Sequence, residues 1–481
     1  MADLDLVIVG MGSGGMPAAE FAMTLGLKVA VVERDRVGGD CLWTGCVPSK
    51  ALLASAKVAH HVRHADRWGL PLFEAPKVDT ARVWRRIKEV QRQIATTDDD
   101  PARYEAMGVE LVHGAARLVD GNTVEVGDRR LASRFVLLCT GSRPATPQIP
   151  GLAEAGYLTS ETFFEQERCP ESLVFIGGGP ISIELAQACN RLGVQVTVLQ
   201  KGPGILPRDE PELAERLASI LVEEGIDLRL GAEVQAVEPG HDGQKVVVAT
   251  VAGDEGGAPL DGGDGPARFE AIDIFVGVGR SPNVKGLGLE DLGIRVGPRG
   301  IETDDRGRTA VKTVYAAGDV AGRTLFTHSA AYEGIRALRD MFFPGKGTVD
   351  ATVPWCTFTD PELAHVGLTG AEAKEQYGDD AHVWRMDLDH NDRARSDGTD
   401  QGAILIVTGP RRRIVGGHIL SPAAGELLHE LALAEAKGMR IDDLAGLMHV
   451  YPTLASSIGA LAAESVFDNA ARIRKVTKFF T

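Results

Sequence analysis

A short apolar run that ends in a cluster of glycines constrains the fold of this chain more than any other feature. The run is 6-LVIVG-10, and the glycines of the turn are Gly10, Gly12, Gly14 and Gly15. A helical segment follows over 16–26, and the next apolar run, 28-KVAVVE-33, closes on Glu33. This order of strand, glycine turn, helix, strand and acid is typical of a dinucleotide-binding fold, in which phosphates lie on the free N–H groups of the helix start. Glu33 is then expected to accept hydrogen bonds from a ribose.

The same order of features recurs in 173-LVFIGGGPISIELAQACNRLGVQVTVLQ-200. Gly177 and Gly179 match the first two glycines, and Ser182 stands where the third is expected. Serine is small enough to keep helix and strand in close contact. Two such folds predict two bound cofactors, or one cofactor and a redox partner that visits the second site.

The second strand of this repeat ends on Gln200, followed by Lys201, where the first repeat has an acid. An acid at this position binds a free 2′-hydroxyl and repels a 2′-phosphate. A neutral glutamine beside a lysine therefore favours NADPH over NADH. The alternative for Lys201 is a solvated surface lysine.

Two cysteines five positions apart, Cys41 and Cys46, follow the first fold in 39-GDCLWTGCVPSK-50. A structural zinc site needs four ligands, and none of the remaining cysteines lies near this pair in the sequence. These four are expected to be isolated: Cys139, Cys169, Cys189 and Cys356. No metal site is therefore predicted. A passive disulfide is also disfavoured, because it would close a very small loop in a large chain of cytosolic character.

The residues after the pair favour redox chemistry. Pro48 suits the first turn of a helix, so Cys46 is expected at a helix N-terminus, where the helix dipole stabilises a thiolate. Lys50 lies one turn further on and adds positive charge. Because a thiolate is the nucleophile in disulfide exchange, Cys41 and Cys46 are predicted to form and break a bond reversibly.

Composition and charge exclude several other classes of protein. The net charge of −16 argues against a nucleic-acid-binding surface. The sequence enters a strand at once, without a secretion signal, and has no apolar run of about 18 residues that could span a membrane. Six cysteines are too few for a disulfide framework in a chain of 481 residues. We therefore expect a cytoplasmic protein with no nucleic-acid or membrane partner.

With these patterns in place, the chain resembles the class I FAD-dependent pyridine nucleotide–disulfide oxidoreductases. This family includes dihydrolipoamide dehydrogenase, glutathione reductase and mercuric reductase, and the pattern is most similar to mercuric reductase-like and dihydrolipoamide dehydrogenase-like members. The segment from Gly39 to Lys50 resembles the family's redox-disulfide motif. The other motifs that carry the resemblance span nearly the whole chain: 137-LLCTGSRP-144, 279-GRSPN-283, 314-VYAAGDV-320, 326-FTHSAAYEG-334, 353-VPWCTFTDPELAHVGLT-369 and 416-GGHILSPAAGELLHEL-431.

The resemblance implies an α/β architecture with two Rossmann-like dinucleotide-binding domains, one for FAD and one for NAD(P), and a C-terminal α+β dimerisation domain. The protein is accordingly expected to be a homodimer. The implied domains are FAD-binding over 1–148 and 276–347, NAD(P)-binding over 149–275, and dimerisation over 348–481. The Gly- and Asp-rich insert 252–268 is expected to be a mobile hairpin loop of the NAD(P) domain.

The resemblance also assigns roles to single residues. Lys50 and Glu184 are implied to form an ion pair beside the reactive nitrogen of the flavin. Cys46 is implied to be the thiol nearest the flavin, and Cys41 the outer thiol that meets the electron acceptor. The implied FAD-binding residues are Gly10, Gly12, Gly14, Gly15, Glu33, Gly39, Thr140, Gly141, Asp319 and His328. Those implied for NAD(P) are Gly177, Gly179, Gln200, Lys201 and Gly279.

One motif near the C-terminus departs from the family pattern. Members that reduce disulfides carry H-P-T-x-x-E, whose histidine protonates the leaving thiolate across the dimer and whose glutamate orients that histidine. Here the sequence is 449-HVYPTLASS-457, with Tyr451 at the histidine position and Ser456 at the glutamate position. A tyrosine with a pKa of about 10 cannot relay protons at neutral pH as a histidine of about 6.5 does. His449, two residues earlier, is an alternative proton donor, but on an extended stretch it is expected to point differently.

This departure argues against lipoamide or glutathione disulfide as the electron acceptor. A soft Hg²⁺ ion held by two thiolates needs no protonated leaving group, and the Tyr451 oxygen could approach it as a catalytic group. The tail 470–481 has no cysteine pair of the kind that delivers the metal in mercuric reductases, so quinones, other metals and small electrophiles remain candidates. Trp43, between the cysteines, either shapes access to Cys41 or simply packs at the helix start.

The predicted function is electron transfer from NAD(P)H through FAD to a Cys41–Cys46 disulfide and on to a non-disulfide acceptor. One alternative is a dihydrolipoamide dehydrogenase with an atypical proton relay. A second alternative is a flavoprotein that senses redox state or nucleotides and turns over little.

Overall fold

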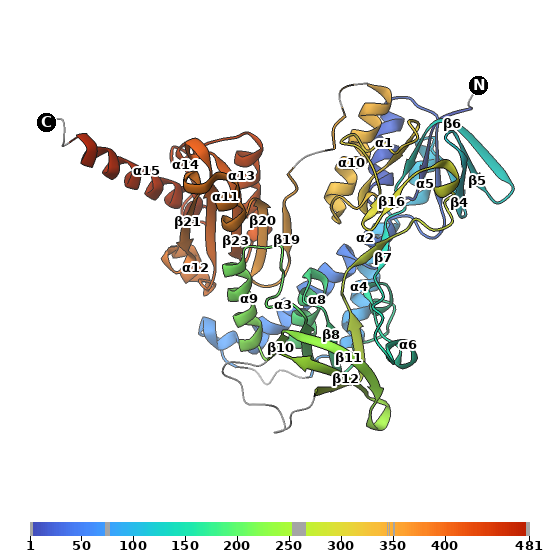
Figure 1. The fold of residues 1–481 in the computed structure, drawn as a ribbon. Helices are drawn as coiled ribbons and strands as arrows, with labels where there is room; N and C mark the ends of the chain where they lie inside the picture. The colour runs from blue at the N-terminus through green and yellow to red at the C-terminus, as the bar shows by residue number, and fades with distance from the viewer. Residues whose placement is uncertain are drawn as a thin grey trace.

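The computed structural model describes residues 3–72, 77–252, 266–343, 345, 347–349 and 352–477, with the backbone alone for 468–477. Three units of helices and strands meet around helices α3 and α8 (Figure 1). Two of the units are dinucleotide-binding folds and the third is an α+β unit, which confirms the architecture expected from the sequence. Among the described helices, none is both long and apolar enough to cross a membrane.

The first unit is built on a seven-stranded sheet in the order β3-β2-β1-β6-β5-β4, with β18 paired to β6. Strand β1 lies at its centre, parallel to both β2 and β6. Its residues 6–9 are buried, as a parallel strand covered by helices on both faces requires. The strands are β1 (Leu4–Val9), β2 (Val29–Glu33), β3 (Glu110–His113), β4 (Ala116–Asp120), β5 (Thr123–Val126), β6 (Arg129–Leu138) and β18 (Val314–Ala316). The helices are α1 (Gly15–Thr24), α2 (Gly39–Trp43), α3 (Cys46–Arg63), α4 (Thr80–Ala95), α5 (Pro101–Ala106) and α10 (Thr327–Phe342).

The chain leaves this unit and returns to it through one pair of antiparallel strands. Strand β7 (Ser142–Pro144) leads out, and β15 (Arg280–Pro282) leads back and pairs with it. A small hairpin, β16 (Val296–Gly297) and β17 (Gly300–Ile301), precedes β18. Helix α10 then packs against α1 and completes the first unit.

The second unit has a parallel sheet in the order β10-β9-β8-β14 and an antiparallel sheet in the order β11-β12-β13. Its strands are β8 (Ser172–Ile176), β9 (Gln195–Gln200), β10 (Asp227–Leu230), β11 (Ala232–Pro239), β12 (Lys245–Val251), β13 (Ala267–Ala271) and β14 (Asp273–Val276). Its helices are α6 (Leu152–Ala155), α7 (Ser160–Phe163), α8 (Pro180–Arg191) and α9 (Pro211–Glu223). The expected mobile loop joins the neighbouring strands β12 and β13, and its residues 253–265 lie outside the described part of the chain.

The third unit is an antiparallel sheet in the order β19-β20-β23-β22-β21 with helices on it. Its strands are β19 (Trp355–Thr357), β20 (Glu362–Gly367), β21 (His382–Asp387), β22 (Ala403–Thr408) and β23 (Ile414–Ser421). Its helices are α11 (Gly370–Tyr377), α12 (Asp392–Asp397), α13 (Ala424–Ala436), α14 (Ile441–Ala445) and α15 (Ser456–Thr477). Helix α15 begins against α14 and extends away from the body of the unit towards the C-terminus (Figure 1).

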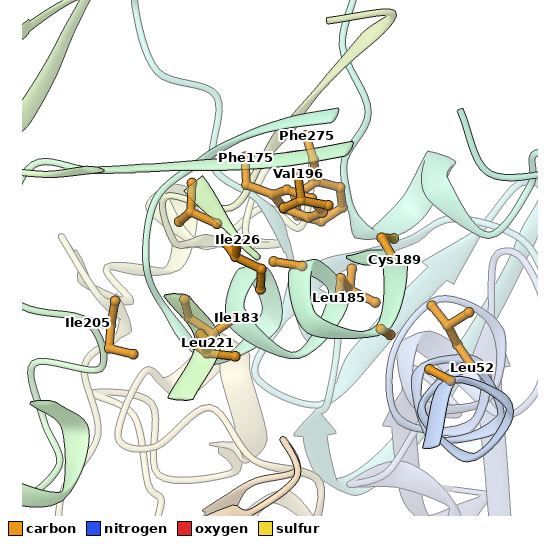
Figure 2. Packing of buried hydrophobic residues seen from close by; sticks show 14 of the residues in the cluster. Leu52, Phe175, Ile183, Leu185, Cys189, Val196, Ile205, Leu221, Ile226 and Phe275 are labelled. Carbon is orange, nitrogen blue, oxygen red and sulfur yellow. The ribbon is translucent and has the colours of Figure 1, made fainter. Parts of the chain in front are cut away.

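One hydrophobic cluster joins all three units. Helix α8 lies at its centre and contributes Ile183, Leu185 and Cys189, and Phe175 of β8 belongs to the same cluster (Figure 2). Leu52 of α3 packs on the same cluster, as do residues of β20, β22 and β23 in the third unit. Because protein interiors are close-packed, this shared core holds α3 and α8 in one register relative to each other. The side chains that project from these two helices form the candidate active site.

Candidate active site

The two cysteines lie where a short helix ends and a long one begins. Cys41 is in α2, and Cys46 is the first residue of α3. Both are free thiols, and Cys46 Sγ shares a hydrogen bond with Thr327 Oγ1 at 3.2 Å. Thr327 begins α10, which is 281 positions away along the chain. The first and last parts of the first unit therefore meet at this sulfur.

The surroundings make the two thiols unequal. The hydrogen bond from Cys41 is the largest of the effects that lower the pKa of Cys46 to about 6, and Thr327 and Lys50 act in the same direction against burial. The same hydrogen bond, together with burial, raises the pKa of Cys41 far above its usual range. The lowered pKa favours the thiolate on Cys46, and the raised pKa favours the thiol on Cys41.

An ion pair lies one turn beyond the thiolate. Lys50 Nζ is 2.8 Å from Glu184 Oε2, so the pair joins α3 to α8. Glu184 is only 5% exposed, and its other oxygen accepts a hydrogen bond from the backbone N–H of Phe358 at 2.8 Å. The Lys50 ammonium lies 4.3 Å from the centroid of the Phe358 ring. Each unit of the fold thus contributes one residue to this charged group.

The glycine turn after β1 has the shape that a dinucleotide needs. Gly10 has φ +100, and a methyl group there would lie 2.3 Å from the carbonyl oxygen of Cys139. A methyl group on Gly39 would lie 2.9 Å from the Cα of Gly12, so two backbone segments approach each other closely at the start of α1. Glu33 supports the turn, because its Oε2 accepts the N–H of Met11 at 2.7 Å. These residues fit the FAD pyrophosphate and ribose that the resemblance assigns to them.

The other glycines implied for FAD lie at the same turn. A methyl group on Gly15 would come 2.0 Å from the carbonyl oxygen of Gly10, and one on Gly14 would come 3.3 Å from Cys139 Sγ. Gly14 and Gly15 are both buried. Helix α1 therefore packs directly on the end of β1, as the fold requires.

Asp319 lies in the short helical turn after β18 and belongs to a polar cluster. Its Oδ2 accepts a hydrogen bond from Ser142 Oγ at 2.5 Å and forms an ion pair with Arg280 Nε at 3.4 Å. Burial raises the pKa of Asp319, and the hydrogen bond from Ser142 opposes this rise. The neighbouring Gly318 donates its N–H to Glu333 Oε2 on α10 at 2.8 Å. The turn that presents Asp319 is thus held by a buried carboxyl group.

Replacing Glu333 with glutamine is expected to remove a loss of stability that wild type shows as the pH rises from about 4.5 to about 7. Burial raises the pKa of Glu333 from 4.5 to about 7, although the Gly318 N–H lowers it. Because the folded-state pKa is raised, this contribution to stability is full below the unfolded pKa and is lost as the pH rises through about 7. The size of the loss should be on the order of 2–3 kcal/mol.

Thermal unfolding of the two proteins at about pH 5 and about pH 8 checks this linkage. Wild type should lose more of its unfolding midpoint between the two pH values than Glu333→Gln does, since glutamine keeps an acceptor for the Gly318 N–H. Glu105, exposed on α5, is the matched control, because Glu105→Gln should follow wild type at both pH values. An identical pH dependence in wild type and Glu333→Gln would show that Glu333 does not titrate in this range.

The remaining residues implied for FAD lie at the crossing between the units and at the start of α10. Thr140 Oγ1 donates to the carbonyl oxygen of Asn283 at 2.8 Å, and the N–H of Asn283 donates to the carbonyl oxygen of Gly141 at 3.0 Å. His328 stacks on Phe326, with ring centroids 5.5 Å apart, and its Nε2 lies 2.8 Å from the carbonyl oxygen of Pro354. These contacts join the outgoing and returning chain segments beside the cysteines.

The second glycine turn is open where a nicotinamide dinucleotide is expected. A methyl group on Gly177 would lie 2.5 Å from the carbonyl oxygen of Gly277, but one on Gly179 or Gly279 would meet nothing within 4 Å. The turn is therefore tight at its first glycine and leaves room at the second, as a bound pyrophosphate requires. This geometry fits an NAD(P) site.

The residues that were expected to select the nucleotide are already engaged within the chain. Gln200 Oε1 accepts the N–H of Gly178 at 2.9 Å, and its Nε2 donates to the carbonyl oxygen of Gly204 at 3.1 Å. Glu33 makes the corresponding contact in the first fold, so the two strand ends support their glycine turns in the same way. Lys201 is exposed and pairs with Glu233 at 2.7 Å. The alternative of a surface lysine describes its position better than that of a group aimed into the turn.

Trp43 packs rather than covering the outer thiol. Its Nε1 donates to the carbonyl oxygen of Val37 at 2.8 Å, and the Arg36 guanidinium lies 4.4 Å from the ring centroid. These contacts turn the indole towards the loop before α2. Simple packing at the helix start, one of the two alternatives for this residue, accounts for them.

The expectation that the remaining cysteines are isolated is wrong for two of them. Cys169 Sγ and Cys189 Sγ lie 3.5 Å apart in the buried core of the second unit. They are twenty positions apart in the sequence and meet because the segment before β8 packs on α8. Across the described ranges, no group of three or more His, Cys, Asp or Glu residues is arranged to hold a metal ion.

Tyr451 and His449 point to different partners. Tyr451 is 70% exposed and donates its hydroxyl proton to Asp392 Oδ2 at 2.6 Å. The His449 ring is directed inward, with its Nε2 3.0 Å from Glu430 Oε1 on α13. The tyrosine therefore occupies the exposed position and the histidine is part of the domain interior. This agrees with the expectation that the two side chains point differently.

Sequence patterns did not identify several residues that complete the site. They are Thr327, Phe358, Asp392 and Glu430. Thr327, Phe358 and Asp392 contact an expected site residue from a segment at least 59 positions away, and Glu430 contacts His449 from 19 positions away. Thr327, Phe358 and Glu430 do lie inside segments that resemble family motifs, so position within a motif is the one signal that could have identified them.

Comparison with known proteins places this geometry in a family. Residues 4–334 match the family described as pyridine nucleotide-disulphide oxidoreductase, and residues 353–462 match the dimerisation domain of that family. A mercuric reductase of Staphylococcus aureus is 33% identical over 97% of this chain and 83% of its own length. A dihydrolipoyl dehydrogenase of Thermus scotoductus is 34% identical over 98% of this chain and 99% of its own length.

A solved structure agrees on the fold. The HOCl-induced flavoprotein disulfide reductase RclA of Escherichia coli superposes with a TM-score of 0.81 at 24% sequence identity, over 95% of this chain and 99% of that one. The sequence matches, together with two glycine turns, a thiolate at a helix start and a lysine–glutamate pair beside it, identify an enzyme that uses FAD and a pyridine nucleotide. The chain belongs to the pyridine nucleotide-disulphide oxidoreductase family, class I.

Proposed function

We propose that this enzyme passes electrons from NAD(P)H through FAD to a Cys41–Cys46 disulfide and on to an acceptor that is not itself a disulfide. The observation that carries the proposal is the position of the Cys46 thiol, at the start of α3 with a lowered pKa and one turn from the Lys50–Glu184 pair. A passive thiol in a core has a raised pKa, as Cys139 does through burial. The lowered pKa of Cys46 is what redox exchange requires.

FAD, when bound, supplies the step between a hydride donor and a two-electron acceptor. The residues that would hold it are those of the β1–α1 turn, with Glu33, Gly39 and Asp319. Lys50 holds a positive charge beside the thiolate, and the buried Glu184 keeps that ammonium in place. Reduction of the Cys41–Cys46 bond takes two electrons and one proton, and leaves a thiolate on Cys46 and a thiol on Cys41.

The nature of the acceptor follows from Tyr451. A leaving thiolate must be protonated, and the family's disulfide reductases use a histidine for this step. A tyrosine has an unsuitable pKa, and Tyr451 already donates its proton to Asp392. A metal ion takes up no proton, and a quinone can take its two protons from solvent, so neither has a thiolate leaving group that a side chain must protonate. For a divalent ion M²⁺ the overall reaction is NAD(P)H + M²⁺ giving NAD(P)⁺ + H⁺ + M⁰, and for a quinone Q it is NAD(P)H + H⁺ + Q giving NAD(P)⁺ + QH₂.

The proposal includes NADPH as the preferred donor, because Gln200 brings no negative charge to the end of β9. The support comes from this neutrality and not from Lys201, whose charge is paired with Glu233. It also includes a homodimer, since residues 353–462 match a dimerisation domain and exposed apolar side chains lie beside Tyr451. These side chains are Leu447, Met448 and Val450. The closely spaced thiols suit a reducing compartment, and we assign the protein to the cytoplasm on that ground.

Steady-state turnover by the purified holoenzyme tests the proposal. Wild type and Cys41→Ala are compared with NADPH and with NADH, using lipoamide, glutathione disulfide, a quinone and Hg(II) in excess thiol as acceptors. The expected result is turnover with Hg(II) or the quinone, higher kcat/KM with NADPH, and loss of that turnover in Cys41→Ala. Fast turnover of lipoamide would show that another group relays protons. Turnover that does not depend on Cys41 would show that electrons leave directly from the flavin.

A further inference from the structure

The segment around Tyr451 contains a second residue that the family motif does not predict. Asp392, the first residue of α12, accepts the Tyr451 hydroxyl proton on Oδ2 at 2.6 Å. The family motif has a glutamate five positions after its histidine, and here that position is Ser456. The carboxylate beside the catalytic side chain thus comes from a segment 59 positions earlier in the chain.

The contact between Asp392 and Tyr451 is built into the domain. Asn391, only 7% exposed, caps α12 by accepting the N–H of Ala394 on its Oδ1 at 3.0 Å. Its amide nitrogen donates to Ser457 Oγ at 2.7 Å and to the carbonyl oxygen of Thr453 at 3.0 Å. A buried side chain therefore fastens the start of α12 to the segment that follows Tyr451. Since Asp392 is the next residue, its carboxylate is held at the hydroxyl.

This hydrogen bond decides what the tyrosine can offer to an acceptor. A hydroxyl has one proton to donate and two lone pairs that accept. The proton of Tyr451 is given to Asp392, and the hydrogen bond and negative charge of Asp392 raise the pKa of Tyr451. The hydroxyl therefore stays protonated at neutral pH and presents lone pairs beside a carboxylate. Such a group favours a cation and has no proton to give to a leaving thiolate.

We infer that Asp392 is a positioning residue for Tyr451 and that the pair selects cationic metal acceptors over disulfides. This inference rests on the proposed function, because it takes Tyr451 to lie at the acceptor site. It goes further by naming the class of acceptor and by assigning a role to Asp392.

The test compares Asp392→Asn with Asp389→Asn, which removes one negative charge from a neighbouring position. Asp389 lies three positions earlier, is exposed and contacts His390 at 3.7 Å, so Asp389→Asn removes the same charge without touching Tyr451. Tyr451→Phe is the third variant. The holoenzymes are assayed with Hg(II) in excess 2-mercaptoethanol, with a neutral quinone and with lipoamide. The rate of flavin reduction by NAD(P)H is measured separately.

Asp392→Asn should lower kcat/KM for Hg(II) by about tenfold, with flavin reduction and quinone turnover unchanged. Asp389→Asn should retain the wild-type value. A spectroscopic measurement gives a test that does not depend on any acceptor. The ionisation of Tyr451 is followed as the difference in phenolate absorbance between each protein and the same protein with Tyr451→Phe. This ionisation should move to lower pH in Asp392→Asn only. A purely structural role for Asp392 would not move it.

The contrary outcomes are distinct. Equal losses in Asp392→Asn and Asp389→Asn would mean that only diffuse charge matters, which overturns the positioning role. If Tyr451→Phe lowered kcat/KM for Hg(II) but Asp392→Asn kept the wild-type value, the inference would be overturned and the proposed function would stand. Turnover of the quinone or of lipoamide but not of Hg(II) by wild type would overturn the selection of cations. A wild type whose turnover never depends on Cys41 would overturn the proposed function itself.

Discussion

Replacing Cys46 with serine is expected to lower turnover of the acceptor by about three orders of magnitude and to leave flavin reduction by NAD(P)H intact. Serine cannot form the bond to Cys41, and its hydroxyl does not ionise near neutral pH. The thiolate that Cys41, Thr327 and Lys50 stabilise is then missing, so electrons have no path through the disulfide. Stopped-flow spectroscopy of the two half-reactions separates the effects.

Cys356 supplies the control for this change. It is a half-buried thiol near Glu184 and Lys50, but burial and the nearby carboxylates raise its pKa, so it is not a nucleophile. Cys356→Ser should therefore turn over as wild type does. If Cys46→Ser retained more than about a tenth of the wild-type turnover, the acceptor would take its electrons from the flavin and the disulfide would be bypassed.

Replacing Arg191 with alanine is expected to destabilise the fold by about 3–5 kcal/mol. The Arg191 side chain is 5% exposed, and its nitrogens donate to Glu224 and to Asp360, at 2.8 Å and 2.7 Å for the Nε and Nη1 bonds. Glu224 belongs to the second unit and Asp360 to the third, so the guanidinium joins the two units. Without it Glu224 loses its counter-ion and Asp360 keeps only Lys57, at 3.1 Å. A largely buried charge left unpaired is costly.

Guanidinium unfolding curves measure this loss. Arg117, which pairs with Asp291 at the surface at 2.8 Å, is the control, and Arg117→Ala should change stability by less than about 1 kcal/mol. Burial acts to raise the pKa of Asp360, but the charges and hydrogen bonds of Arg191 and then of Lys57 outweigh it and hold the pKa below the usual range. This stabilisation is present above the unfolded pKa of about 4 and is lost as the pH falls, so the difference between Arg191→Ala and wild type should shrink in acid. A difference below about 1 kcal/mol at neutral pH would contradict the role of the cluster.

Local patterns in the sequence predicted those parts of the site that neighbouring residues build. The tight turn at Gly10, the helix that starts at Cys46 and the lysine one turn later depend on residues within a few positions of each other. Strand and helix periodicity likewise marked both dinucleotide-binding folds, because side-chain spacing follows backbone geometry. The family resemblance then extended this reading over nearly the whole chain.

Two expectations from the sequence differ from the structure, and both differ for the same reason. Cys169 and Cys189 meet in the core, although nothing near either residue in the sequence marks the contact. Lys201 pairs with Glu233 on another strand and is not aimed at the glycine turn. In each case the partner is brought near by how one element packs on another, and linear spacing does not encode such packing.

The amino-acid order alone therefore predicted the family, the two dinucleotide-binding folds and the pair of cysteines that we propose carries electrons. The tertiary structure decided which cysteine has the lowered pKa, which carboxylate accepts the Tyr451 proton, and how α3 and α8 bring Lys50 to Glu184 across 134 positions. The physical reason is that a contact between distant segments is the sum of many weak packing interactions in a shared core. No single residue or short motif encodes these packing interactions, because they form only when the whole core is assembled.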